Sequence, residues 1–542
     1  MFKLNWWKDS VFYQIYPRSF RDHNGDGVGD LKGIIEKLDY LSWLGVDVVW
    51  ISPFFKSPMK DFGYDISDYK DVDPLFGTLS DFDDLVSEIH LRGMKIIIDQ
   101  VYNHTSDKHP WFIESRSSLN NPKSDWYIWK DPKPDGSPPN NWVSLFSGEK
   151  PLSAWEWDDN RKQYYLHLFG KEQPDLNWRN PEVKSAIFDS IEFWLEHGVD
   201  GFRFDAASHY YKDPLFRDAL KGPQIKKSLF HSVRDEYYWD RFSARPESLL
   251  AAEEIKSFMD SYGEKVSVAE IPADMGLCLY LLFTIPGRFD IAFNIDFMEK
   301  LSLNAEKVRE LSENVDAFFG ERAWPSYVLG NHDNYRIINR LTDGMKVSED
   351  EKKSIAKLMA TFLLTIRGTP FIYYGEEIGM EDTDIPYDRI VDPWGKSLWP
   401  KKGRDVCRTP MQWNNGENAG FSETTPWLPV NPNKTFVNVE DETKDPNSIL
   451  NFYRSLLKLR KDHVALRRGT MKFQDVPCGI IFYVRKTSKE RVAVLLNFSS
   501  AVQCVDLTFD GKVLIGSHKE SGEKFRESIE LAPFESVVMD VF

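Results

Sequence analysis

Charged side chains follow several short apolar runs of this sequence. The runs end in D-Q-V-Y-N-H at 99–104, G-F-R-F-D at 201–205, A-E at 269–270 and N-H-D at 331–333. If the runs are strands of one parallel barrel, the residues at their carboxyl ends meet at one rim, where such residues are typical of catalysis. Besides Asp99, the rim would then carry the three carboxylates of Asp205, Glu270 and Asp333, two histidines and one arginine.

Two of these carboxyls are expected in opposite protonation states. Arg203 and Asp205 are two residues apart on a strand, so their side chains point the same way, and the guanidinium should lower the pKa of Asp205. Glu270 follows Val268 and Ala269, and an apolar setting raises the pKa of a carboxyl. An ionised nucleophile beside a protonated acid is the arrangement of glycoside hydrolysis. Asp333 could then stabilise the oxocarbenium charge.

A purely structural role and a metal site are the alternatives to this hypothesis. A lone Asp more often caps a helix or forms a salt bridge, and a lone His more often has a structural role. Purely structural roles do not readily account for a set of such residues at the ends of four strands. The two histidines and three carboxylates could also coordinate a cation. Arg203 would oppose a cation at the same rim.

Eight strand–helix units are expected to position these residues. Helical periodicity is clear over 80–91 and after Asn180 and Pro181, and a further helix is expected over 31–44. Eight parallel units favour a (β/α)8 TIM barrel over an open doubly wound sheet, since no glycine-rich phosphate fingerprint follows the first strand. The expected strands are Val11–Tyr16, Val46–Ile51, Lys95–Ile98, Val199–Phe204, Val266–Ala269, Phe289–Phe293, Ser326–Leu329 and Phe371–Tyr374.

Two regions depart from this alternation. Residues 105–175 are rich in Trp, Pro and Asn without helical periodicity, which predicts a small inserted domain after the third strand. Short alternating segments over 469–542 predict a C-terminal antiparallel β-sandwich. The barrel would comprise residues 1–104 and 176–468.

Composition narrows the classes of partner. The 542 residues include 68 Lys and Arg against 84 Asp and Glu, a net charge of −16, and no long basic run, which disfavours nucleic acid. The four cysteines lack zinc-ligand spacing and a disulfide framework. The sequence shows neither a signal peptide nor a transmembrane run, so we expect a cytoplasmic protein without membrane contact. Its oligomeric state is not readable.

The segment R-D-H-N-G-D-G-V-G-D at 21–30 resembles the first half of a calcium loop. Acidic and amide residues occupy loop positions one, three, five and nine, but position twelve is Gly33, where an EF-hand carries a bidentate Glu. The segment is therefore either a different metal site or an acidic turn in which Asp30 caps the next helix.

The strand-end motifs, in this order, make the sequence resemble the α-amylase family of glycoside hydrolases over almost its whole length. The segments Y-Q-I-Y-P-R-S-F at 13–20, G-Y-D-I-S-D-Y at 63–69, Q-P-D-L-N at 173–177 and R-T-P-M-Q-W at 408–413 make it similar to the α-glucosidase and oligo-1,6-glucosidase branch. The resemblance implies a retaining, double-displacement enzyme that acts on a small oligosaccharide without an organic cofactor.

The resemblance also implies roles for individual residues. Asp205 would be the nucleophile, Glu270 the acid/base and Asp333 the transition-state stabiliser. Substrate-binding residues would be Arg203, His104 and His332 at subsite −1; Asp61, Tyr64 and Arg408 at its closed end; Phe146 or Phe169, with Gln173, from the inserted domain; and Ala206 beside subsite +1. Structural calcium would be bound by Asp22, Asn24, Asp26, Asp30 and the Val28 carbonyl.

Linkage preference depends on fewer residues. Oligo-1,6-glucosidases typically have Val where this chain has Ala206, and Gln where it has Asn334, so the resemblance favours exo-acting cleavage of maltose and short α-1,4-glucosides. E-I-P-A-D at 270–274 departs from familiar forms and bears on acceptor preference. Alternatives are an oligo-1,6-glucosidase and glucosyl-transferring enzymes such as sucrose isomerase or trehalose synthase, although the R-L-D-R-D loop of sucrose isomerases is absent. Non-catalytic transporter subunits are disfavoured because all three carboxylates are present.

Overall fold

Eight short parallel strands form a near-closed barrel. The computed structural model describes residues 5–148, 150–221, 239–271, 276–401 and 403–542. Hydrogen bonds join the strands in the order β11-β10-β9-β5-β2-β1-β13-β12. These strands are β1 (Phe12–Ile15), β2 (Val48–Ile51), β5 (Lys95–Gln100), β9 (Gly201–Phe204), β10 (Val266–Ala269), β11 (Ile291–Ala292), β12 (Ser326–Val328) and β13 (Thr369–Tyr373). The Ser326 hydroxyl donates to the Ala292 carbonyl (2.7 Å) between the two edge strands, and the predicted barrel is confirmed.

Helices cover the outside of the barrel, because strands buried on both faces need an apolar cover. The first residue of α6 is Pro181. Asn180 caps this helix, and its side chain accepts a hydrogen bond from the Glu182 N–H. The helix expected over 31–44 is two helices separated at Lys37 (φ −106°, ψ 4°). The larger helices are α2 (Leu31–Glu36), α3 (Leu38–Leu44), α4 (Leu79–Leu91), α6 (Pro181–Glu196), α7 (Pro246–Ser261), α8 (Gly276–Thr284), α10 (Ala305–Phe319), α12 (Glu349–Thr365) and α15 (Ile449–Asp462). Within the described ranges, none has the length and apolar character needed to cross a membrane.

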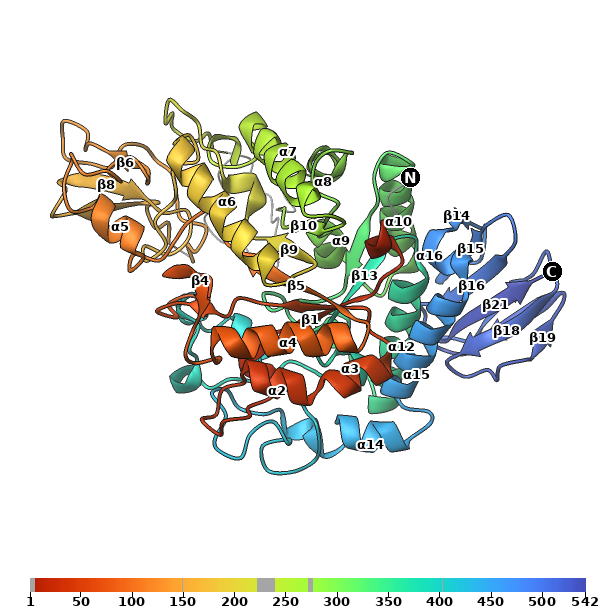
Figure 1. Cartoon of the computed structure of the whole chain (residues 1–542). Coiled ribbons are helices and arrows are strands. Elements are labelled where there is room, and N and C mark those ends of the chain that lie inside the picture. Colours follow the sequence, from red (N-terminus) through yellow and green to blue (C-terminus); the bar gives the residue numbers. More distant parts are fainter. Residues whose placement is uncertain (1–4, 149, 222–238, 272–275, 402) are drawn as a thin grey trace.

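A small unit is inserted between β5 and β9. It contains α5 (Pro110–Ser115) and an antiparallel sheet of β6 (Trp129–Lys130), β8 (Gln163–Leu166) and β7 (Trp155–Asp158). Its core includes Trp142, Trp155 and Leu166 and extends to Phe242, so the unit packs on the segment that follows β9. Figure 1 shows this unit and the C-terminal sheet at opposite ends of the molecule.

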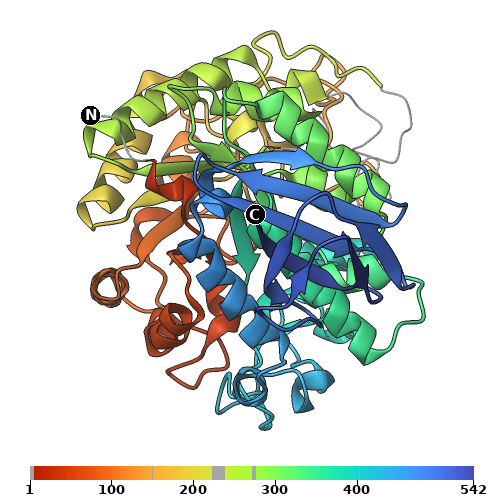
Figure 2. The same cartoon turned by 90° about the vertical axis from the view of Figure 1, so that its right-hand side faces the viewer.

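The C-terminal part is antiparallel, as predicted. Its larger sheet contains β14 (Thr470–Phe473), β15 (Ile480–Lys486), β16 (Arg491–Asn497), β21 (Ser536–Val541), β18 (Gly511–Gly516) and β19 (Lys524–Phe525). A second sheet of β17 (Gln503–Asp506) and β20 (Ser528–Leu531) shares its apolar core. Figure 2 shows the larger sheet in front of the barrel, where Thr361 of α12 meets Ser536 (Oγ1 to Oγ, 2.8 Å).

Candidate active site

One guanidinium joins the ends of three adjacent strands. Arg203 on β9 contacts Asp99 on β5, donates from Nη1 to Asp205 Oδ1 (2.8 Å), and holds Glu270 Oε2 2.8 Å from Nη2. Because β5, β9 and β10 are neighbours in the sheet, their carboxyl ends lie side by side. The structure therefore brings Asp205 and Glu270 together with Asp99 around an arginine that is 1% exposed.

The electrostatics of these two carboxyls differ from the sequence-based expectation. Burial raises the pKa of Asp205 well above its ordinary value, Arg203 opposes this rise, and Glu270 adds to it. Arg203 lowers this pKa, as expected, but burial, which is the largest influence, and Glu270 together outweigh it, so the expected low pKa was wrong. Glu270 is also not in an apolar setting, since it pairs with Arg203. Two carboxyls held side by side on one guanidinium can supply the nucleophile and acid/base pair that glycoside hydrolysis uses.

Ala206, directly after Asp205, has a left-handed backbone (φ 46°, ψ 35°), a region that residues other than glycine seldom adopt. In this conformation its N–H donates to Glu270 Oε2 (3.3 Å). Backbone strain of this kind clusters at functional sites. The turn after Asp205 is thereby fixed against the second carboxyl of the pair.

Asp333 lies among cations at the end of the loop that follows β12. Its Oδ1 accepts from Arg408 Nη2 (2.7 Å) and Arg404 Nη1 (3.3 Å), and its Oδ2 lies 3.2 Å from His332 Nε2. Burial alone would raise the pKa of Asp333, but the guanidinium groups of Arg404 and Arg408 hold it well below its ordinary value. This carboxylate is therefore ionised, as a group that stabilises positive charge on a sugar must be.

Asp61 forms an ion pair with an arginine that was not predicted from the sequence. Arg404 Nη2 donates to Asp61 Oδ1 (2.8 Å), and the same guanidinium donates twice to the buried Asp392 (2.9 Å each). Arg408, which the resemblance placed at the same closed end, donates to Asp333 and to the His332 carbonyl (2.6 Å). Arg404 stands only four residues before Arg408, and no spacing signal distinguishes the one that reaches Asp61.

The two histidines are neutral and fixed by hydrogen bonds. Burial lowers the pKa of His104 to about 4 and that of His332 to about 3. His332 Nε2 lies 2.8 Å from the Tyr64 hydroxyl, and the two rings stack with centroids 5.3 Å apart. Gln173 Nε2 lies 3.1 Å from both His104 Nε2 and Asp61 Oδ2. Tyr64, His332, His104, Gln173 and Asp61 are thus linked into one hydrogen-bonded set, the floor of the candidate site.

Both aromatic candidates from the inserted unit face this floor. The Phe169 ring lies 5.1 Å from the ring of His104, and the Phe146 ring lies 5.6 Å from that of Phe169. Phe146 also stacks on Trp394, and the Arg404 guanidinium lies over its ring at 5.3 Å. The structure thus places Phe169 beside the floor and Phe146 above the arginine that closes it.

The loop over residues 21–30 is saturated with internal hydrogen bonds. Asp22 accepts from the N–H groups of Gly25 (2.7 Å) and Gly27 (2.8 Å) and from the Ser422 hydroxyl (2.6 Å). Asp30 Oδ1 accepts from the Gly33 N–H (2.7 Å) and caps α2, as one of the two sequence-based alternatives expected.

The remaining members of the calcium set also bond within the loop. Asp26 accepts from the Val28 N–H (2.8 Å), and Asn24 accepts from the Asp26 N–H (2.9 Å). Hard oxygen donors of this kind suit calcium, so the donor chemistry fits. However, no group of three or more His, Cys, Asp or Glu side chains in the described part of the chain is placed to hold a metal. The calcium site stays a prediction.

The family model described as "Alpha amylase, catalytic domain" matches residues 14–469, which include all three rim carboxyls. The chain belongs to the α-amylase family of glycoside hydrolases. It is 42% identical to a probable alpha-glucosidase of Rhizobium meliloti (strain 1021) over 93% of this chain and 91% of that protein. It is 41% identical to the oligo-1,6-glucosidase of Parageobacillus thermoglucosidasius, over 99% of each chain.

Solved structures of this family superpose closely. The alpha-glucosyl transfer enzyme XgtA matches with a TM-score of 0.92 and 39% identity, over 99% of each chain. The trehalulose synthase MutB from Pseudomonas mesoacidophila MX-45 matches with a TM-score of 0.89 and 37% identity, again over 99% of each chain. These relatives share a scaffold but are named for both hydrolysis and glucosyl transfer.

Proposed function

We propose that this family member is a retaining, exo-acting α-glucosidase that releases α-glucose from maltose and short α-glucosides. The observation that carries the proposal is the single Arg203 guanidinium held by both Asp205 and Glu270. The two carboxyls also interact directly enough for Glu270 to raise the pKa of Asp205. Such closeness suits the roughly 5–5.5 Å separation of retaining enzymes better than the roughly 6.5–9.5 Å of inverting ones.

The proposed reaction has two displacements. Asp205 attacks the anomeric carbon, the glycosidic C–O bond breaks, and Glu270 gives its proton to the leaving oxygen. Glu270 then takes a proton from water, which attacks the glucosyl–Asp205 ester and releases α-glucose with net retention. Asp333, held ionised by two arginines, opposes the positive charge that develops on the ring.

Exo action is supported by the closed end of the site. The buried Asp61–Arg404 pair and Gln173 leave a floor of directed polar groups beside His104. A terminal glucose can place its hydroxyl groups on that floor, whereas a chain that continued past it would leave the Asp61–Arg404 pair broken and buried. The substrate end that fits is therefore the non-reducing end.

Linkage preference is the finer part of the proposal. Ala206, which is 4% exposed, donates its backbone N–H to Glu270, the residue that would face the leaving sugar. The segment after Glu270, which bears on acceptor preference, lies at 272–274 outside the described residues. Initial rates on maltose, isomaltose, sucrose and trehalose test the preference, and a dominant rate on isomaltose would overturn it. NMR of the first product should show α-glucose, and β-glucose would exclude retention.

Glucosyl transfer is the second candidate, and the similarity to XgtA and MutB favours it. A transferring enzyme uses the same carboxyls but delivers the glucosyl group to a sugar in place of water. Product analysis at high maltose or sucrose concentration separates the two functions. Isomers or longer oligosaccharides as the main products would favour transfer, and free glucose as the main product would favour hydrolysis.

A further inference from the structure

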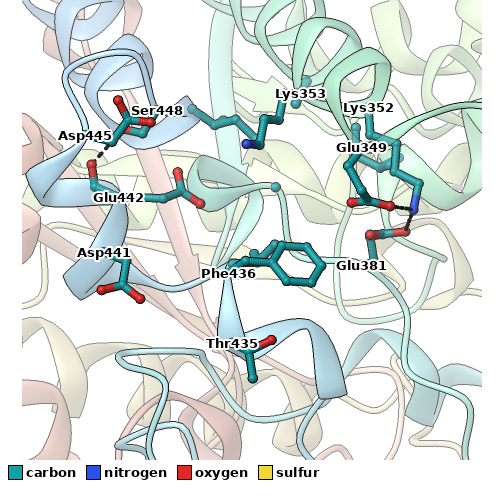
Figure 3. A pocket seen from close by; sticks show the side chains of 15 residues that line it. Glu349, Lys352, Lys353, Glu381, Thr435, Phe436, Asp441, Glu442, Asp445 and Ser448 are labelled. Carbon is teal, nitrogen blue, oxygen red and sulfur yellow. Dashed lines mark hydrogen bonds and ion pairs between the residues drawn. The ribbon is translucent and has the colours of Figure 1, made fainter.

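A second pocket lies outside the candidate active site. Its volume is about 320 Å³, within the range of roughly 300–1,000 Å³ that is typical of small-molecule sites. Its walls come from the first turns of α12, the loop after β13, residues 435–437, α14 (Val439–Lys444) and the start of α15. It shares none of its lining residues with the candidate site, and Figure 3 shows it from close by.

The lining carries charges of both signs. Lys352 pairs with Glu349 and Glu381 at 2.9 Å each, on one side of the pocket. Lys353 reaches toward the middle, opposite Glu442 (Figure 3). The five carboxyl groups of the lining, from Glu349, Glu381, Asp441, Glu442 and Asp445, would repel a simple anion, and Lys352 and Lys353 would oppose a simple cation. A neutral ligand rich in hydroxyl groups can donate hydrogen bonds to the carboxylates and accept them from the ammonium groups.

Glu442 leaves one carboxyl oxygen facing this space. Its Oε2 accepts from the Leu450 N–H (3.0 Å), whereas nothing in the described part of the chain donates to Oε1. The residue is only 9% exposed, and its carboxyl points into the pocket in Figure 3. Burial raises the pKa of this carboxyl to about 8. Because this oxygen faces the pocket, a ligand hydroxyl can donate to it.

Phe436 supplies the apolar surface that the charged walls lack. Its side chain is 51% exposed, and Figure 3 shows the ring between the Glu442 side and the Lys352 side. A half-exposed aromatic ring offers a flat apolar surface to a ligand in the pocket. One face of a pyranose presents C–H groups that pack on such a ring while its hydroxyl groups point outward.

We propose that this pocket is a second, non-catalytic binding site for one neutral sugar of glucose size. The sugar would stack on Phe436, donate a hydroxyl to Glu442 Oε1, and accept from Lys353. The inference does not depend on which glycosidic link the catalytic site cleaves. It goes beyond the proposed function, because the pocket has no residue in common with the rim of Asp205, Glu270 and Asp333.

Glucose itself is the probe, since it is not hydrolysed. Calorimetric titration of the full chain with glucose should reveal a binding site whose affinity depends on the pocket. Phe436→Ala should weaken that affinity by about tenfold or more, and Glu442→Gln should weaken it by several-fold. Phe542→Ala, at another exposed Phe, and Glu440→Gln, on the same helix α14, are matched controls that should leave it unchanged. A crystal soaked in glucose should show the sugar on the Phe436 ring.

Activity separates this proposal from the proposed function. Phe436→Ala should keep the kcat/KM of the parent on maltose, because the pocket has no lining residue in common with the rim. A parent without hydrolytic activity but with Phe436-dependent glucose binding would refute only the proposed function. Glucose binding that neither pocket variant alters would refute the second site. Binding of inorganic phosphate or calcium in place of glucose, lost in Glu442→Gln, would also refute it.

Discussion

Replacing Arg404 by Met removes the cation that closes the candidate site. The guanidinium makes four contacts: two with Asp392 at 2.9 Å, one with Asp61 at 2.8 Å and one with Asp333 at 3.3 Å. Breaking a buried pair by removing one partner costs about 3–5 kcal/mol, because the other charge stays buried. If about 3–4 kcal/mol of this falls on the transition state, kcat/KM decreases by roughly 10²–10³-fold.

The same variant should change the pH dependence of the reaction. Burial raises the pKa of Asp61, and Arg404 is the strongest influence that lowers it. Arg404 also lowers the pKa of Asp333. Without Arg404 both carboxyls keep their protons to higher pH, so the acidic limb of the kcat/KM profile should move to higher pH, and part of the lost rate should return on the alkaline side.

The assay is hydrolysis of an aryl α-glucoside across the pH range, with circular dichroism to confirm that each variant is folded. Arg404→Lys is the matched control, because it keeps the charge but loses the planar fork that binds Asp392 twice. It should retain the position of the acidic limb better than Arg404→Met. A folded Arg404→Met variant with kcat/KM within about threefold of the parent, and an unmoved limb, would refute the closing role.

Three further predictions test other parts of the molecule. Asp205→Ala and Glu270→Gln should each remove nearly all hydrolysis of maltose, and a variant with parental rates would exclude the assigned role. Burial raises the pKa of Glu376 from 4.5 to about 8. Between these two values the folded chain keeps a proton that the unfolded chain releases, so the free energy of unfolding decreases as the pH rises from about 4.5 to about 8. Glu376→Gln should lose this component, on the order of 5 kcal/mol at pH 8, and an equal pH dependence of Tm in both proteins would contradict it. Chelation should lower Tm if the loop over 21–30 holds calcium, and unchanged Tm and activity would reject the metal.

Sequence reasoning reached the strand ends because they follow a local rule. A run buried on both faces predicts a parallel strand, and polar residues just beyond it must meet at one rim. Arg203 and Asp205 share a face because they are two residues apart. Asp30 and Asn180 could be predicted as helix caps for the same local reason.

The parts that were missed depend on distances between segments far apart in the chain. Arg404 and Arg408 are equally plausible partners for Asp61 in the sequence, and only the packing of their loop decides that Arg404 reaches it. The pKa of Asp205 could not be predicted from Arg203 alone, because the net effect depends on how many carboxyls share that guanidinium and how deeply they are buried.

The sequence by itself determined the barrel, the order of its motifs and the residue types at its rim, because hydrophobic periodicity and strand alternation are properties of neighbouring residues. Tertiary structure alone decided which charges touch. It assigned Arg404 to Asp61, joined Asp205 and Glu270 through one arginine, and placed Phe436 and Glu442 in one pocket. Electrostatic energies vary with distance and burial, and both are set only when the whole chain has packed.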